Sequence, residues 1–346
     1  MIYIGIESSC DETSVAVLKD NELVSNLVAS QHFHKKYGGV VPELSSRAHL
    51  QIISPLLNQA LEESGVSLNE VDVISATAGP GLIGAVLVGL TFAKGLALST
   101  GADFIGVNHI EGHIFSGFLM ERKPEYPYLC LVVSGGHTLL LIVESPLKII
   151  KLGSTVDDAA GEAFDKVSKL IGLGYPGGPQ IQKYAAKGDE KFTKFPVSKL
   201  KGKYDFSFSG IKTAVLRFVQ SNYENGIPEE DLSNISASFQ AAVVKALVQN
   251  MENALNEFDI KSISVVGGVA ANQKLKESVT ALGAKYKKPV VIPELQFCGD
   301  NGAMIALRGK MLHEAGEKFD LSYNAFPSLK KGGMKYWYDV NGNRLV

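Results

Sequence analysis

The feature of this sequence that most constrains its fold is a strand–turn–strand pattern that occurs once near the start of each half. Residues 2–18 read as an apolar strand, a polar turn and a second apolar strand, and residues 128–143 repeat this order. Gly and Ser in such turns let successive backbone N–H groups approach an anion closely. A single copy is typical of an ordinary β-hairpin. Two copies, one opening each half, favour a duplicated domain with a nucleotide bound between the halves.

A third Gly-rich turn lies within residues 262–275, between a predicted strand and a predicted helix. A helix that begins after such a turn presents free N–H groups and its positive dipole end to an anion. The turn contains Gly267-Gly268 but lacks the Gly-x-Gly-x-x-Gly pattern of a Rossmann dinucleotide site, and it lacks the Gly-Lys-Ser/Thr of a P-loop. Those two nucleotide-binding classes are therefore excluded.

Length and charge predict a soluble globular protein of about two α/β domains. The chain has 346 residues, 34 Lys and Arg against 36 Asp and Glu, and 45% hydrophobic residues. We expect a first domain over residues 1–127, a second over 128–320, and a tail over 321–346 that packs back on the first domain. The three cysteines form no C-x-x-C pair, which is typical of a reducing cytosol and predicts a cytoplasmic location.

One segment, residues 73–93, has no charged residue and is long enough to imitate a membrane span. Its Ala78-Gly79-Pro80-Gly81 turn instead predicts a buried strand followed by a helix. In that helix Gly81, Ala85, Gly89 and Ala93 recur at every fourth position and form a stripe of small side chains. We interpret the stripe as tight packing of the helix on a sheet, and we expect no membrane association.

A candidate metal site begins with His109 and His113, which lie four residues apart in a predicted helix capped by Asn108. Two imidazoles at this spacing share one helix face and can bind one metal ion, although such a pair alone is more often structural. Zinc proteases need Glu directly after the first His, and Ile110 is there instead. Glu111 lies roughly 200° around the helix from His109 and points away from the metal. Proteolysis is therefore a minor hypothesis.

Nine sequence blocks together carry a resemblance to a known family. They are Gly5–Thr13, Val41–His49, His109–His113, Val133–His137, Asp157–Asp165, Tyr175–Pro179, Asp205–Thr213, Gly267–Asn272 and Cys298–Asn301. In this order, and over nearly the whole chain, they resemble the tRNA N6-adenosine threonylcarbamoyltransferase family, TsaD. The resemblance implies the duplicated fold shared by actin, sugar kinases and heat-shock ATPases, with a nucleotide and metal cleft between two domains. The Cys-Asp-Glu-Thr form of the first turn resembles the bacterial branch of the family.

The resemblance also implies a reaction and a set of site residues. The threonylcarbamoyl group of threonylcarbamoyl-adenylate would pass to N6 of the adenosine 3′ of the anticodon, in tRNAs that read codons beginning with A, to form t6A with release of AMP. One divalent ion, Fe or Zn, would be held by His109, His113 and Asp300. The expected donor-binding residues are Val133, Ser134, Gly135, Gly136 and His137 for phosphate and acyl group, Asp165 and Gly178 for the ribose, and Asn272 for the nucleotide.

Three residues are candidates for catalysis. Asp11 and Glu12 would remove the amine proton or order water near the metal, although a solvated acidic turn is an equally good interpretation. His137 would donate to the adenylate, and its alternative is a turn histidine bonded to a carbonyl group. Gln182 replaces an acidic residue that some family members carry, so we assign it no ribose contact.

The resemblance implies partners, and two other functions stay open at this point. The expected partners are tRNA, an inactive TsaB-like paralogue that pairs through the N-terminal domain, and a small TsaE-like ATPase. The exposed surface of the small-residue helix after Gly79 is a candidate dock for the paralogue. The alternative functions are a small-molecule kinase or ATPase of the same fold, and a nucleotide-switched scaffold without an acceptor-dependent product.

Overall fold

The computed structural model describes residues 1–37, 39–198, 200–224 and 226–345, and it contains two β-sheets. The first sheet has the order β3-β2-β1-β4-β5, and the second has the order β10-β9-β6-β7-β8-β11. The strands of the first are β1 (Ile2–Glu7), β2 (Glu12–Lys19), β3 (Glu22–Ser30), β4 (Val73–Gly79) and β5 (Asp103–Asn108). Those of the second are β6 (Tyr128–Val133), β7 (Thr138–Ser145), β8 (Lys148–Ser154), β9 (Ser262–Val266), β10 (Val290–Val291) and β11 (Trp337–Tyr338).

The two sheets have the same topology. In the first, β1 pairs antiparallel with β2 and parallel with β4, and in the second, β6 pairs antiparallel with β7 and parallel with β9. Each half therefore begins with an antiparallel meander and continues through helical crossovers to two parallel strands. This confirms the duplicated α/β fold, and it places the two predicted hairpin turns at equivalent ends of β1 and β6.

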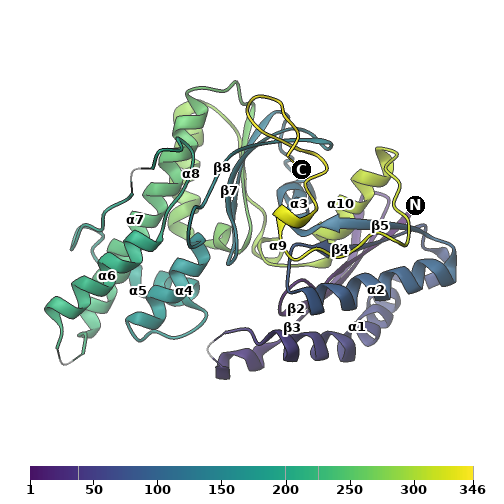
Figure 1. Ribbon diagram of the computed structural model, residues 1–346, viewed down its shortest axis with the longest axis horizontal. Helices are drawn as coiled ribbons and strands as arrows, with labels where there is room; N and C mark the ends of the chain where they lie inside the picture. The colour runs from purple at the N-terminus through teal and green to yellow at the C-terminus, as the bar shows by residue number, and fades with distance from the viewer. Residues whose placement is uncertain (38, 199, 225, 346) are drawn as a thin grey trace.

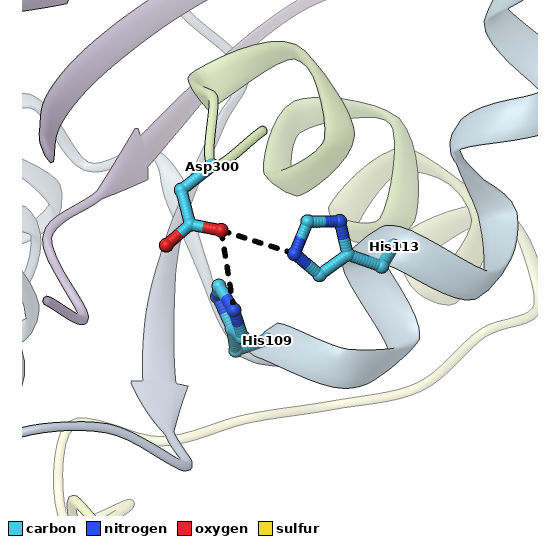
Figure 2. A group of neighbouring side chains, drawn as sticks. All are labelled: His109, His113 and Asp300. Atoms are coloured by element: carbon cyan, nitrogen blue, oxygen red, sulfur yellow. Dashed lines mark hydrogen bonds and ion pairs between the residues drawn. The ribbon is translucent and has the colours of Figure 1, made fainter. Parts of the chain in front are cut away.

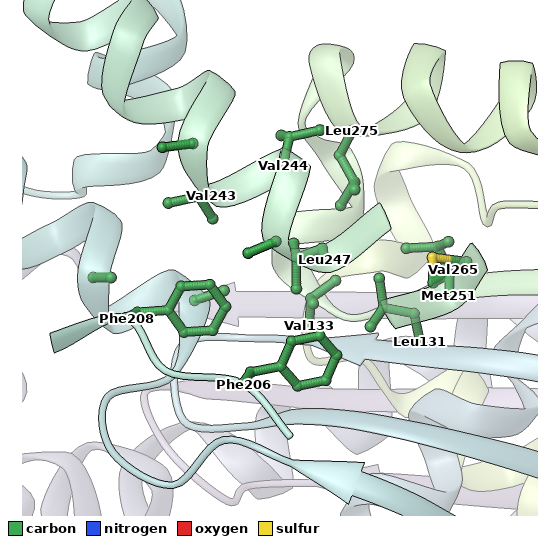
Figure 3. Packing of buried hydrophobic residues seen from close by; sticks show 14 of the residues in the cluster. Leu131, Val133, Phe206, Phe208, Val243, Val244, Leu247, Met251, Val265 and Leu275 are labelled. Atoms are coloured by element: carbon green, nitrogen blue, oxygen red, sulfur yellow. The ribbon is translucent and has the colours of Figure 1, made fainter. Parts of the chain in front are cut away.

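Helices cover the outer face of each sheet (Figure 1). On the first sheet these are α1 (Pro42–Ser64) and α2 (Ile83–Thr100). On the second they are α4 (Ala160–Leu170), α5 (Gly177–Ala185), α6 (Ser209–Asn222), α7 (Glu229–Leu255) and α8 (Gln273–Tyr286). Figure 3 shows part of the second core, in which side chains of α7 such as Leu247 and Met251 pack against strand residues such as Leu131 and Val265. Every second residue of a strand points to this core, and the residues between point to the opposite face of the sheet, which is also covered.

Two helices form an inner layer between the sheets, where Figure 1 shows them side by side. Helix α3 (His109–Phe115) packs Ile114 and Phe115 on the inner face of the second sheet. Helix α10 (Gly302–Glu314) packs Met304 and Ile305 on the inner face of the first. Helix α10 lies within residues 128–320, the range expected for the second domain, but it packs on the first sheet. Helix α9 (Leu295–Cys298) and five short 3-10 turns, at residues 32–37, 68–70, 116–119, 268–271 and 329–331, complete the helices of the described residues.

The tail contacts both sheets in turn. Phe326 packs in the core of the first sheet, and its N–H donates to the carbonyl oxygen of Ala78 at 2.9 Å. Eleven residues later, β11 pairs parallel with β8 at the edge of the second sheet. The tail therefore packs on the core of the first sheet and also adds a strand to the second.

The apolar segment divides into β4 and α2, as the Gly-Pro turn predicts. Helix α2 is long and apolar enough to span a membrane by length and composition alone, but its small-residue stripe is buried against the first sheet. A Cβ atom at Gly89 would lie 2.3 Å from Oγ of Ser8, so only Gly allows this approach. Because Ala85, Gly89 and Ala93 are buried, the stripe itself is not available as a dock, and only the exposed face of α2 remains a candidate.

Candidate metal centre and donor cleft

The three predicted metal ligands come together between the sheets. His113 Nε2 lies 3.0 Å from Asp300 Oδ1, and His109 Nε2 lies 3.5 Å from the same oxygen (Figure 2). One ligand atom from each residue lies within 4.8 Å of the others. Helix α3 brings both imidazoles, because it begins at His109 directly after β5 and is capped by the side chain of Asn108. Two imidazoles and one carboxylate are a donor set that suits Fe²⁺ or Zn²⁺ and leaves positions open for substrate.

The electrostatics of the cluster fit a cation. Burial alone would lower the pKa of His109, but the charges of Asp300 and Glu7 outweigh it and raise that pKa to about 9. Burial alone would raise the pKa of Asp300, but the two histidines hold it well below its usual range. The protein therefore stabilises positive charge between these side chains, and a divalent cation can replace the protons.

Glu7, at the end of β1, is a site residue that the sequence reasoning missed. Its buried carboxylate lies 3.0 Å from His109 Nδ1 and accepts hydrogen bonds from Thr77 Oγ1 at 2.6 Å and from the Ser9 N–H at 2.5 Å. Burial opposes ionisation, but the charge and hydrogen bond of His109 lower the pKa of Glu7. An acceptor at Nδ1 leaves Nε2 free to face a metal, as is usual for metal-binding histidines. The only signal in the sequence is a carboxylate inside an apolar strand pattern.

The first turn lies close to the cluster. Burial, together with the charges of Asp300 and Asp11, raises the pKa of Glu12 to about 9. Both Asp11 and Glu12 are partly exposed.

The second turn faces the same cluster from the other sheet. The Ser134 N–H donates to the carbonyl oxygen of His137 at 2.9 Å, and the His137 N–H donates to Ser134 Oγ at 3.1 Å, which closes the turn after the buried Val133. A Cβ atom added at Gly135 or Gly136 would meet no atom within 4 Å, so the space above the turn is open. Burial and the charges of His109 and His113 lower the pKa of His137 to about 4. His137 is therefore neutral at pH 7.

The residues expected to bind the ribose and nucleotide make their contacts within the second domain. Asp165 Oδ1 accepts a hydrogen bond from the Gly177 N–H, next to Gly178, at 2.7 Å. Both polar groups of Asn272 are engaged, since Oδ1 caps α8 and Nδ2 donates to Gln240 Oε1 at 2.7 Å.

Tyr175 joins this region to the first turn. Burial, together with the charges of Asp11 and Asp165, raises the pKa of Tyr175 to about 12. The Tyr175 side chain is therefore within electrostatic reach of acidic groups from both halves of the chain. Tyr175 belongs to one of the nine blocks, but sequence reasoning gave it no role.

Comparison with known families identifies the chain's relatives. The model of the TsaD family, described as tRNA N6-adenosine threonylcarbamoyltransferase, matches residues 22–307. A protein of this name from Thermosipho africanus is 49% identical over 95% of this chain and 100% of its own length. Another, from Symbiobacterium thermophilum, is 47% identical over 96% of this chain and 97% of its own length.

Two solved structures share the fold at low sequence identity. Full-length HypF in its phosphate- and nucleotide-bound form superposes with a TM-score of 0.62 at 13% identity, over 91% of this chain and 47% of that one. Component A of (R)-2-hydroxyglutaryl-CoA dehydratase from Acidaminococcus fermentans gives a TM-score of 0.53 at 14% identity, over 92% of this chain and 99% of that one. These likenesses support the actin-like duplicated fold and carry no argument about activity.

Proposed function

This chain belongs to the tRNA N6-adenosine threonylcarbamoyltransferase family, and we propose that it forms t6A in the cleft between its two sheets. The observation that carries the proposal is the meeting of His109, His113 and Asp300 with the turn that contains His137. In the reaction, a bond forms between N6 of the adenosine and the carbamoyl carbon of threonylcarbamoyl-adenylate. The bond from that carbon to the phosphate oxygen breaks, AMP leaves, and the amine loses one proton.

The donor would lie between the metal centre and the second turn. His109, His113 and Asp300 would hold a divalent ion, Fe or Zn, which would supply positive charge to stabilise the phosphate and acyl oxygens. The backbone N–H groups of Gly135 and Gly136 face open space at the tip of the turn, and they suit a phosphate. We place the ribose near Asp165 and Gly178. Because the Asn272 side chain is already bonded, we assign it a supporting role that holds α8 and the adjacent Gly-rich turn.

Positioning accounts for most of the expected acceleration. An aromatic amine is a poor nucleophile, and holding it beside an activated acyl group removes much of the entropic barrier. His137 is neutral and can donate a hydrogen bond to charge that develops on the donor. Asp11 and Glu12 border the same space, and we propose that one of these two carboxylates receives the amine proton.

Product analysis tests this function against the two alternatives. The chain and its partners are incubated with threonylcarbamoyl-adenylate and tRNA, and the tRNA nucleosides and AMP are quantified. We expect t6A and AMP in equal amounts, and no product from a tRNA whose target adenosine is replaced by inosine, which lacks the amine. A kinase would instead transfer phosphate from ATP. A scaffold would bind nucleotide without an acceptor-dependent product.

A groove on the first domain is a candidate dock for the TsaB-like paralogue. It has a volume of about 580 Å³ and lies between α1 and α2. Its lining is almost wholly apolar: Leu50, Ile53, Ser54, Leu87, Val88, Thr91, Phe92, Gly95 and Leu96. An apolar groove between two exposed helices suits a second pair of helices.

We also propose that the protein is cytoplasmic and that it acts on tRNA together with the small TsaE-like ATPase.

Leu87→Glu should weaken binding of the paralogue and reduce multiple-turnover modification. Leu87 is 47% exposed and lines the groove, so a carboxylate there would be buried without a partner in the complex. Leu98→Glu is the matched control, because Leu98 is 74% exposed on the same helix and does not line the groove. Titration by calorimetry should show at least about a tenfold loss for Leu87→Glu alone. Equal affinities for both variants would contradict the dock.

A further inference from the structure

A buried charge network lies between the two inner helices, on the side of α3 away from the metal ligands. Arg308 of α10 donates to Glu111 Oε2 through Nε at 2.9 Å and through Nη2 at 2.5 Å. Trp337 Nε1 donates to the other oxygen of Glu111, Oε1, at 2.9 Å. The side chains of Arg308 and Glu111 are 0% and 2% exposed. This network uses the Glu of the His-x-Glu-Gly-His sequence, which the reaction chemistry leaves without a role.

The network joins four separate parts of the chain. Glu111 is on α3, which packs on the second sheet, and Arg308 is on α10, which packs on the first. Arg308 Nη1 also donates to the carbonyl oxygen of Pro146, in the turn between β7 and β8, at 2.8 Å. Trp337 comes from β11 in the tail. The guanidinium group is further held over the ring of Phe115, 4.4 Å from its centroid.

Both helices of this network carry metal ligands. His109 and His113 flank Glu111 on α3, and Asp300 lies immediately before α10, whose first turn is capped by Asn301. A small rotation or separation of α3 and α10 would therefore change the distance from Asp300 to the two imidazoles. Each oxygen of Glu111 and each nitrogen of Arg308 has a bonding partner, and a fully bonded buried pair specifies one arrangement.

We propose that Glu111, Arg308 and Trp337 are positioning residues that hold α3 and α10 at the separation that the metal centre requires. The C-terminal segment then contributes to the metal centre through the indole N–H of Trp337, although no residue of that segment is a ligand. The proposal rests on the metal centre of the proposed function. It goes beyond that function by assigning the tail and the Glu of the motif a part in metal affinity.

Trp337→Phe is the sharpest test, because it keeps an aromatic ring in the core and removes the donor to Glu111 Oε1. The probe is Co²⁺, whose absorption spectrum reports ligand geometry and whose affinity is measured by competition with a chelator. We expect Co²⁺ binding about 10- to 100-fold weaker than in the wild-type chain, with an altered spectrum, as for other residues that orient metal ligands. Arg308→Lys, which keeps the charge but offers fewer donors, should have an effect in the same direction.

Leu247→Ala is the control for general loss of stability. Leu247 is fully buried in the outer core of the second sheet, away from both inner helices, and its truncation leaves a cavity. It should lower the thermal midpoint at least as much as Trp337→Phe but leave Co²⁺ affinity and spectrum unchanged. Wild-type affinity and spectrum in both Trp337→Phe and Arg308→Lys would overturn the proposal and leave the network a purely stabilising contact.

A second readout separates this proposal from the metal centre itself. In metal-free protein, hydrogen exchange of the amides in α3 and α10 should be faster in Trp337→Phe than in the wild type, with exchange in α1 unchanged. If the wild-type chain bound no Co²⁺, the proposed metal centre would be contradicted. Faster exchange in Trp337→Phe than in the wild type would still support the coupling between the tail and the two helices. Unchanged exchange in α3 and α10 would overturn that coupling.

Discussion

His113→Ala is expected to abolish stoichiometric metal binding and reduce threonylcarbamoyl transfer below detection, with the fold intact. Removal of one of three protein ligands leaves a pair, and His113 contributes through Nε2 beside Asp300. It is a cleaner change than His109→Ala, because His109 also neutralises the buried carboxylate of Glu7. Breaking that buried pair costs about 3–5 kcal/mol and would confuse loss of metal with loss of stability.

Metal content after equilibrium dialysis, measured by elemental analysis, checks this prediction. Circular dichroism and the thermal midpoint of the metal-free proteins establish that His113→Ala is folded. His313→Ala is the matched control, since His313 lies on α10 but bonds to Asp103 near the protein surface. Full retention of metal in His113→Ala would remove this residue from the centre.

His137→Ala is expected to keep the metal and the fold but to lower kcat roughly 10²- to 10³-fold. This is the usual loss when a hydrogen-bond donor to charge that develops in the transition state is removed. The backbone N–H groups of the turn remain, so adenylate affinity should fall only modestly. Because burial and the neighbouring histidines lower the pKa of His137 to about 4, the imidazole stays neutral from pH 6 to 8. Its titration should therefore not appear in the pH–rate profile over that range.

Gly136→Ala is the contrasting variant for His137→Ala. Its added methyl group meets no protein atom within 4 Å and would occupy space that we assign to threonylcarbamoyl-adenylate. It should raise KM for the adenylate and change kcat less, whereas His137→Ala should do the reverse. Equal small losses in affinity and turnover for His137→Ala would make His137 a binding residue only.

The repeated topology could be predicted because it follows from local sequence patterns. Each half carries its own hairpin turn and its own alternation of strands and helices, and these patterns depend on neighbouring residues. Spacing predicted only part of the candidate metal site, because the histidine pair alone is local to α3. Asp300 lies 187 residues from His113, and only the family resemblance linked them.

The inner layer could not be predicted from local pattern. Helix α10 follows the second sheet in sequence but packs on the first, a choice made by contacts between distant segments. Arg308 shows the same limit, because a charged helix residue normally indicates a solvated face. It is buried here because Glu111, Pro146 and the ring of Phe115 satisfy it. Glu7 escaped notice for the same reason, since its partner His109 is 102 residues away.

A structure of the chain with Zn²⁺ and AMP bound would test the central claim most directly. Anomalous scattering would locate the ion, and difference density would locate the phosphate. The account predicts an ion coordinated by His109, His113 and Asp300, with the phosphate of AMP against the backbone N–H groups of Gly135 and Gly136. An ion held by other residues, or AMP bound away from this cleft, would contradict it.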